Sequence, residues 1–328
     1  MTRATTFRPT SCATSLPTRR SSLRPKRRAA VWRAAGAALG AALSLGLTGG
    51  AMAFERGIVP FPAGAAGTNI ARLPPVPGLF VLQQFSYAEA QDLYGDDGKK
   101  LPVPFHTTVT AATTRLLASY PVKPFGAQLY SQLVLPVTSL KSNVAGVTAT
   151  QTALTNVTLT PAILKWTATD RLTVVAALDL TLESGAYRTP RPSVAFGYAS
   201  AQPLVALRYS DPQGLDLAIS NRLAINGRNG DTDYRSGSAY IGEFAAGWNT
   251  GPWKLGVVGA YVNQYTDDKS HGAVAPPNGN RGRSLAVGPS VVYDFGKVNL
   301  NVNYQPGVYA VNTSKIDRVW VNLAFRLY

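Results

Sequence analysis

Residues 284–305 read SLAVGPSVVYDFGKVNLNVNYQ and contain two stretches in which apolar and polar side chains alternate. Because successive side chains of a β-strand point to opposite faces, each stretch predicts a strand with one apolar and one polar face. The pattern returns once more in residues 319–327. The apolar places of the first two strands are held by Leu285, Val287, Pro289, Val291 and Tyr293, and then by Val298, Leu300, Val302 and Tyr304.

Strands with two different faces occur in soluble β-sandwiches and in transmembrane β-barrels. In a sandwich the apolar faces of two sheets meet in a dry core. In a transmembrane barrel the apolar face contacts lipid, the polar face lines a lumen, and short turns alternate with long loops. The order of loop lengths along the chain therefore distinguishes the two folds.

The rest of the chain repeats the alternation and predicts twelve strands, whose connections are long and short in turn. Long polar connections are expected at 92–104, 138–155, 185–192, 227–237 and 266–281. The expected strands are 78–89, 105–118, 125–137, 157–163, 172–182, 194–210, 215–225, one that ends at Trp248, 253–261, 284–295, 298–305 and 319–327. Sorting of loops by length and an even number of strands are typical of outer-membrane barrels. The expected fold is all-β: a transmembrane antiparallel up-and-down β-barrel of about twelve strands that covers residues 78–328.

The N-terminal part of the chain carries much of its positive charge. Of the 32 basic residues, nine lie in residues 1–53, which contain no acidic residue, and 23 remain against 17 acidic residues. The charge is thus not spread over a folded domain, as it would be in a nucleic-acid-binding protein. A basic leader, a Gly/Ala-rich apolar run and the ending Ala51-Met52-Ala53 predict an export signal peptide, 1–53, with cleavage after Ala53. Residues 54–77 mix Gly, Pro and Ala without periodicity and predict a flexible periplasmic segment.

Cysteine and histidine usage argues against a catalytic centre. Cys12 is the only cysteine, and it lies in the leader, so the exported chain has neither a disulfide nor a thiol nucleophile. The two histidines, His106 and His271, are expected in outer loops without the additional ligands that a zinc site needs. We therefore expect no enzyme, no metal and no cofactor. No apolar run of about 20 residues follows Ala53, so a membrane would be crossed by strands.

Charged side chains on the polar face are the candidate lumen and selectivity residues: Arg171, Asp179, Glu183, Arg208, Asp216, Arg222, Glu243 and Arg326. A lumen enclosed by twelve strands is too wide to be filled as an eight-stranded barrel is. Charges of both signs could pair across it and narrow it, and arginines there would favour anionic solutes such as aromatic carboxylates. The alternative is that the pairs only hold the barrel together.

Five blocks of the sequence together resemble the bacterial family of outer-membrane proteins named for the MetA-pathway of phenol degradation. They are Leu73–Phe80 (LPPVPGLF), Leu159–Trp166 (LTPAILKW), Thr232–Gly237 (TDYRSG), Tyr265–Asp268 (YTDD) and Val287–Asp294 (VGPSVVYD). The resemblance extends over about residues 70–328. It implies an outer-membrane β-barrel that passes hydrophobic or aromatic compounds to catabolic enzymes, and it carries no agreed set of functional residues.

These observations predict an exported protein of the Gram-negative outer membrane that acts as a passive channel for small hydrophobic or aromatic solutes. The alternative function is a structural or adhesive barrel whose lumen is closed by its own side chains. Expected partners are outer-membrane lipid and lipopolysaccharide, the transported solutes and the barrel-assembly machinery, but not nucleic acid. Whether residues 54–77 or the loops plug the lumen stays open at this point.

Overall fold

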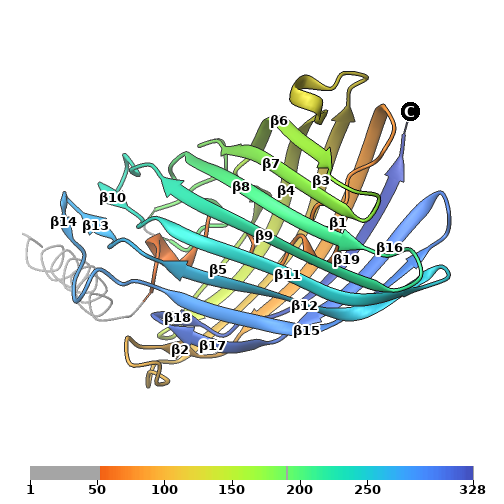
Figure 1. The fold of residues 1–328 in the computed structure, drawn as a ribbon. Coiled ribbons are helices and arrows are strands. Elements are labelled where there is room, and N and C mark those ends of the chain that lie inside the picture. Colours follow the sequence, from red (N-terminus) through yellow and green to blue (C-terminus); the bar gives the residue numbers. More distant parts are fainter. Residues whose placement is uncertain (1–51, 190, 328) are drawn as a thin grey trace, which may run out of the picture. The chain divides into compact units, whose positions relative to one another are not determined.

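The computed structural model describes residues 52–189 and 191–327. In these residues twelve long strands form one closed antiparallel barrel (Figure 1). Each strand pairs with the next long strand in the chain, and the last pairs with the first. The strands are β1 (Gly78–Ala90), β3 (Phe105–Ser119), β4 (Gln128–Val144), β6 (Thr158–Thr167), β7 (Leu172–Thr181), β8 (Ser200–Ser210), β9 (Leu215–Asn226), β11 (Ala239–Thr250), β12 (Trp253–Gln264), β15 (Arg283–Asp294), β16 (Val298–Gln305) and β19 (Asp317–Arg326).

Closure explains how these strands can lie in lipid. β1 pairs with β3 from Gly78↔Ser119 to Ala90↔Thr107, and its other edge pairs with β19 from Phe80↔Arg326 to Glu89↔Asp317. A strand edge without a partner would expose polar backbone groups to hydrocarbon, and a closed ring has no such edge. The predicted transmembrane β-barrel is confirmed.

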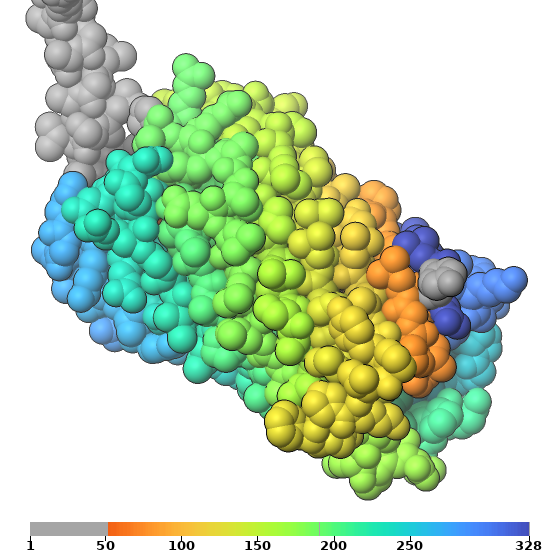
Figure 2. Space-filling model, turned by 90° about the horizontal axis from the view of Figure 1, so that it is seen from above, coloured from red at the N-terminus to blue at the C-terminus, as the bar shows by residue number. Residues whose placement is uncertain are grey.

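The two faces of the barrel are the reverse of those of a soluble protein. On β9, Leu215, Leu217 and Ile219 are 41–43% exposed, whereas Asp216 and Ser220, which alternate with them, are 1% and 6% exposed. Figure 2 shows the outer face from β1 (orange) to β9 (green) as a wall without a visible opening. An apolar outside and a polar inside fit a wall that contacts lipid.

The two ends of the barrel differ in their connections. At one end, here called the turn end, short segments join β6 to β7, β8 to β9, β11 to β12 and β15 to β16, and a longer one with η3 (Pro124–Gly126) joins β3 to β4. The opposite end, the loop end, carries the longer connections. Its small sheets are built from β2 (Leu93–Tyr94), β10 (Tyr234–Arg235), β13 (Lys269–Ser270), β14 (Ala273–Val274) and β18 (Thr313–Ser314), while β17 (Gly307–Val311) pairs with β15.

The connection predicted at 138–155 is wrong, because most of it is a β-hairpin. β4 continues to Val144 and turns into β5 (Val147–Leu154), which pairs with β4 along its length. Ala145 and Gly146 form the two-residue turn, and both have positive φ, 51° and 83°, as the tightest hairpin turns require. The several threonines of this segment favour a strand, although its many small and polar residues resemble those of a loop.

Two further details concern β6 and β8. Pro161 lies where the pairing of β6 with β7 shifts its register, between Leu159 and Ile163. At such an irregularity the sheet does not need the N–H group that proline lacks. The strand predicted at 194–210 begins only at Ser200. Its predicted first residues belong to the loop end, where Ala195, Phe196 and Tyr198 are buried. Among the described residues, no helix is long and apolar enough to cross a membrane, a finding that concerns helices alone.

Candidate functional site

Residues 54–77, called the inner segment below, run through the interior of the barrel from the loop end to the turn end. Phe54 packs against Ala224, Ile241 and Val262 near the loop end. At the other end the carbonyl of Pro77 accepts a hydrogen bond from Arg326 at 3.1 Å. The orange-red chain that precedes β1 lies between the front and back walls in Figure 1. The structure thus differs from the flexible periplasmic segment predicted at 54–77. The predicted signal peptide, 1–53, lies outside the described residues up to residue 51 and stays a prediction.

Side chains of the wall satisfy the backbone of the inner segment, which has little secondary structure beyond the short turns η1 (Glu55–Gly57) and η2 (Gly67–Asn69). A buried carbonyl without a partner is costly, so donors must come from elsewhere. Wall donors and the carbonyls they bind are Gln202 and Pro60 (3.3 Å), Arg318 and Ala63 (2.6 Å), Gln305 and Gly64 (3.0 Å), Gln84 and Ala65 (2.9 Å), and Lys165 and Leu73 (2.9 Å). The inner segment is thereby fixed along most of its length.

Glu243 binds the middle of the inner segment as an acceptor, whereas the wall side chains named above are donors. Its Oε1 accepts the N–H groups of Gly64 at 2.9 Å and Ala66 at 3.1 Å, and the side chain is buried. Arg115 and Arg318 are close enough to interact with this carboxylate electrostatically, as is Arg222. Such charge-assisted hydrogen bonds in a buried site are stronger than neutral ones.

Arg222 and Asp179 form a buried ion pair on the loop-end side of Ile70. Nη1 of Arg222 lies 2.6 Å from Oδ2 of Asp179 and donates to Gln202 at 3.0 Å. Oδ1 of Asp179 accepts a hydrogen bond from Thr160. The guanidinium carbon of Arg222 lies 3.9 Å from the ring centroid of Phe61 in the inner segment, a cation–π contact. The pair therefore stabilises both the wall and the segment.

A second charged cluster lies near the turn end. Arg208 pairs with Asp216 at 2.5 Å, and Lys254 reaches the other carboxylate oxygen at 3.3 Å. Arg208 also donates to two carbonyls of the inner segment, those of Thr68 at 2.9 Å and Ile70 at 3.2 Å. All three charged side chains are buried. Removing Asp216 would leave two positive charges inside the barrel without their carboxylate.

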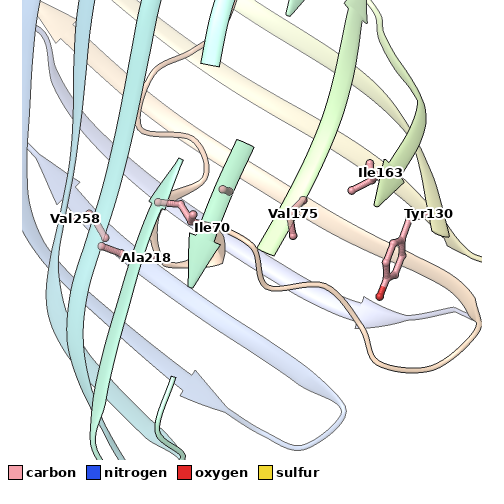
Figure 3. Packing of buried hydrophobic residues seen from close by; sticks show 8 residues of the cluster. Ile70, Tyr130, Ile163, Val175, Ala218 and Val258 are labelled. Carbon is pink, nitrogen blue, oxygen red and sulfur yellow. The ribbon is translucent and has the colours of Figure 1, made fainter. Parts of the chain in front are cut away.

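An apolar patch lies between these two charged clusters. Ile70 of the inner segment packs there against residues of the wall (Figure 3). The patch, called the Ile70 patch, consists of Ile70, Tyr130, Ile163, Val175, Ala206, Ala218, Ala245 and Val258. On β9 the inward order is Asp216, Ala218, Ser220 and Arg222, which shows the change from charged to apolar and back along a single strand. The interior thus offers an apolar surface between polar ones.

Both ends of the barrel carry recesses. A recess of about 430 Å³ at the loop end is lined by Tyr187, Arg188, Thr189, Arg191 and Asp231. One of about 340 Å³ at the turn end includes Arg72, Lys165, Arg208, Asp216 and Lys254. Between them the inner segment passes through the interior and is hydrogen-bonded to side chains of the wall.

Five of the eight candidate lumen residues lie inside, namely Asp179, Arg208, Asp216, Arg222 and Glu243. The other three lie at strand ends, where alternation no longer fixes the direction of a side chain. Arg171 pairs with Asp211 at 2.8 Å at the turn end, and Glu183 is exposed beyond the end of β7. Arg326 is exposed at the turn end. The ion pairs inside join neighbouring parts of the wall instead of crossing the lumen.

Three further charged residues of the interior are not among the candidates predicted from the sequence. Arg115, Lys254 and Arg318 occupy inward places on β3, β12 and β19, and Arg115 donates to Gln132 at 2.9 Å. Lys254 and Arg318 occupy the polar places of their strands in the alternation, the signal that identified the other charges, whereas Arg115 shares the parity of Val109, Ala111 and Leu117 and gives no such signal. The inner segment itself gives no signal, because it contributes main-chain groups: the carbonyl of Ala63 to Arg318 and the N–H groups of Gly64 and Ala66 to Glu243.

The histidines lie at the surface. His106 is 3.0 Å from Glu89, and His271 is 3.4 Å from Asp233. Within residues 52–189 and 191–327, no three His, Cys, Asp or Glu side chains are grouped so that they could hold a metal ion. That the protein is not an enzyme and needs no cofactor stays a prediction.

Known structures resemble this barrel. An outer-membrane channel from Pseudomonas putida F1 superposes with a TM-score of 0.71 at 15% identity, over 78% of this chain and 97% of that one. The translocator domain of the autotransporter NalP from Neisseria meningitidis gives 0.48 at 11% identity, over 81% and 93%. A deletion variant of the monoaromatic hydrocarbon channel TodX gives 0.42 at 9%, over 78% and 92%. At these identities the first of them supports the fold alone.

Sequence comparison assigns the chain to a family. No curated protein is found to match it in sequence. The family model with the description "Putative MetA-pathway of phenol degradation" matches residues 90–323, well over half of the chain. The chain therefore belongs to this family, as the five blocks of sequence predicted.

Proposed function

We propose that the protein is an outer-membrane channel for the passive uptake of small hydrophobic or aromatic compounds that feed a catabolic pathway. The observation that carries the proposal is the Ile70 patch, an apolar surface in the middle of the barrel that lies between two buried charged clusters. An apolar solute gains free energy from such a surface, and it would gain none from a lumen lined only by charges. Membership in the phenol-degradation family agrees with this class of solute.

In this proposal Ile70 occupies the place that a solute takes during passage. The inner segment has to move aside, and the two recesses are the entry and exit. Because long loops of such barrels face the outside and short turns the periplasm, the solute enters at the loop end. Lipid and lipopolysaccharide surround the wall, and the barrel-assembly machinery inserts it.

The candidate lumen charges have a role in the same proposal. Once the inner segment moves, Arg208 and Arg222 lose their contacts with it and line the path. Aromatic solutes that carry a carboxylate would then be favoured over cationic ones of the same size.

The test replaces two inward valines by the isosteric but polar threonine. Val175→Thr with Val258→Thr places two hydroxyl groups in the Ile70 patch, and Val174→Thr with Val257→Thr is the matched control on the outward faces of the same strands. Uptake of a labelled monoaromatic compound into cells with a lipopolysaccharide barrier should fall about tenfold in the inward variant, since burying a hydroxyl group without a hydrogen-bond partner costs about 1–3 kcal/mol. Equal uptake by the inward variant, the control and a deletion strain would contradict the proposal.

The second candidate is a structural or adhesive barrel with a closed lumen. It is favoured by the inner segment, which lies inside the barrel and is held there by hydrogen bonds to side chains of the wall. Deletion of the gene distinguishes the two: loss of growth on one aromatic carbon source supports the channel, whereas unchanged growth with a leaky envelope supports the structural function. Planar-bilayer recordings of the purified protein that never show conductance would also favour the closed barrel.

A further inference from the structure

Asp268, in the connection between β12 and β15, is a fully buried carboxylate. It accepts hydrogen bonds from the N–H of Gly237 at 2.6 Å, from Gln264 at 2.7 Å and from the hydroxyl of Tyr234 at 2.7 Å. The main-chain nitrogen of Phe54 lies near this carboxylate, because the next residue, Glu55, binds Ser236 beside Gly237. No ion pair found among the described residues includes Asp268, and burial raises the pKa of its carboxyl to about 6. A buried carboxylate normally has a cation beside it.

Phe54 has a backbone conformation that an internal aromatic residue rarely adopts. Its φ is 59° and its ψ is 160°. Positive φ brings the β-carbon of an L-residue against its own backbone, at a cost of order 1–3 kcal/mol. The angle φ is defined by the carbonyl carbon of the preceding residue, which an N-terminal residue lacks. The strain would therefore vanish if Phe54 were the first residue of the chain.

The surroundings of Phe54 fix the position of its nitrogen. Its side chain is 3% exposed and packs against Ala224, Ile241 and Val262. The next residue, Glu55, donates its N–H to Ser236 at 3.0 Å, and its carboxylate accepts from Thr232 and Asn229, each at 2.7 Å. A group at the nitrogen of Phe54 is therefore held against Asp268.

We propose that the chain is cleaved between Ala53 and Phe54 and that the freed α-ammonium group of Phe54 forms a buried ion pair with Asp268, which anchors the inner segment at the loop end. A signal peptidase adds water across the amide bond. Ala53 leaves with the leader as a carboxylate, and the amine of Phe54 takes up a proton. The carbonyl of Asn312, which accepts the N–H of Ala53 at 2.6 Å, is then free for the ammonium group or for water.

The experiment uses the exported protein purified in detergent. Its intact mass and N-terminal sequence should show a chain that begins at Phe54. An amine-acylating reagent should modify this α-amine about tenfold more slowly in the wild type than in Asp268→Asn, because each unit by which the ion pair raises the pKa of the amine reduces the reactive fraction tenfold. Asp267→Asn is the matched control, since Asp267 pairs with Arg281 at 2.7 Å on the outside. Lys99, whose side chain is 84% exposed, serves as the internal reference.

A mature chain that begins at Met52 or at any other residue would overturn the inference. So would an α-amine that reacts equally fast in the wild type and in Asp268→Asn. If the variant does not fold, the folded wild type is compared with the same protein denatured in hot detergent, and equal reactivity of the α-amine relative to Lys99 would be equally decisive. None of these outcomes depends on whether a solute passes the channel.

Discussion

Glu243→Gln is expected to loosen the inner segment without disturbing the wall. The substitution keeps the shape of the side chain and removes its charge. Oε1 of Glu243 accepts the N–H groups of Gly64 at 2.9 Å and Ala66 at 3.1 Å. An amide oxygen in its place can accept both, but as a neutral partner, and the arginines nearby lose their carboxylate.

The magnitude follows from these two bonds. A hydrogen bond to a charged group contributes about 1.5–3 kcal/mol and a neutral one about 0.5–1.5 kcal/mol, so each of the two loses roughly 1 kcal/mol. The free energy that keeps the inner segment in place is then reduced by about 2 kcal/mol. The population of the displaced state, in which the segment has moved aside, rises roughly 30-fold. Arg115 and Arg318 lose a nearby carboxylate, which acts in the same direction, whereas Arg222 keeps its ion pair with Asp179.

Two measurements report the displaced state. The fraction of time that a single molecule conducts in a planar bilayer should rise by this factor. A cysteine reporter, Ala66→Cys, should become accessible to a bulky maleimide at a correspondingly higher rate, and it would be unique because Cys12 lies in the leader. Glu183→Gln, at an exposed position beyond β7, is the matched control.

The reasoning would be refuted if Glu243→Gln folds into a closed barrel, seen as a heat-dependent shift in gel migration, and yet conducts and reacts as Glu183→Gln does. A uniform loss of barrel formation would instead mean that Glu243 stabilises the wall. In that case Glu243→Asp, which keeps the charge but shortens the side chain, should restore the fold and leave the segment loose.

Three further predictions concern the interior and its loop end. Arg208→Met should lower the free energy of unfolding by about 3–5 kcal/mol, because Asp216 keeps only Lys254 as a cation and the carbonyls of Thr68 and Ile70 lose their donor; urea titration in lipid vesicles measures it, and a loss no larger than that of the exposed Arg171→Met would contradict it. Gly64→Ala should release the inner segment, because its new β-carbon would lie 2.2 Å from Gln305, whereas Gly296→Ala, also at positive φ (83°) but with nothing within 4 Å, should cost stability alone; maleimide labelling of the Ala66→Cys reporter compares the two, and equal rates would contradict the prediction. A chain that starts at Met52 keeps the carboxyl pKa of Asp268 raised to about 6 from 3.8, so its stability should increase as pH falls from 6 toward 4 and be lost as pH rises through 6, by on the order of 3 kcal/mol. A chain that starts at Phe54 should lack this gain, because the ammonium group holds the carboxylate ionised. Tyr198 and Tyr234, which also interact with Asp268, are common to both chains, so the difference between their unfolding midpoints isolates Asp268, and identical pH profiles would contradict the ion pair.

The strands and their inward faces could be predicted from the sequence because alternation is a local property. A strand in lipid must put one face toward hydrocarbon, so each residue reports its own direction. The candidates on β7, β8, β9 and β11 were found in this way. The prediction fails where a strand extends past the rest of the wall or ends: Gln151 on one face of β5 is covered by the loop end, and Arg171 and Arg326 lie at strand ends.

The course of the inner segment could not be predicted, because its stabilising contacts join residues far apart in the chain. Gln305 binds the carbonyl of Gly64 across 241 positions, and Glu243 binds the N–H of the same residue across 179. The segment contributes mostly backbone groups, which every sequence has. One signal exists: more polar side chains point inward than the wall can pair with one another. Their number indicates that further hydrogen-bond partners lie inside the barrel.

A barrel of twelve strands encloses more space than its own side chains fill, and this chain fills the space with backbone. The choice has a consequence for transport. An apolar solute can replace Ile70 in the Ile70 patch, but it can replace none of the hydrogen bonds that Glu243, Arg208 and Arg318 make to the inner segment. Water must replace those hydrogen bonds when the segment moves. Under the proposal the channel therefore opens only when water enters the lumen, and the segment returns when the solute has left. Under the proposal, substitutions in the charged clusters change how often the channel opens, whereas substitutions in the Ile70 patch change which solute passes.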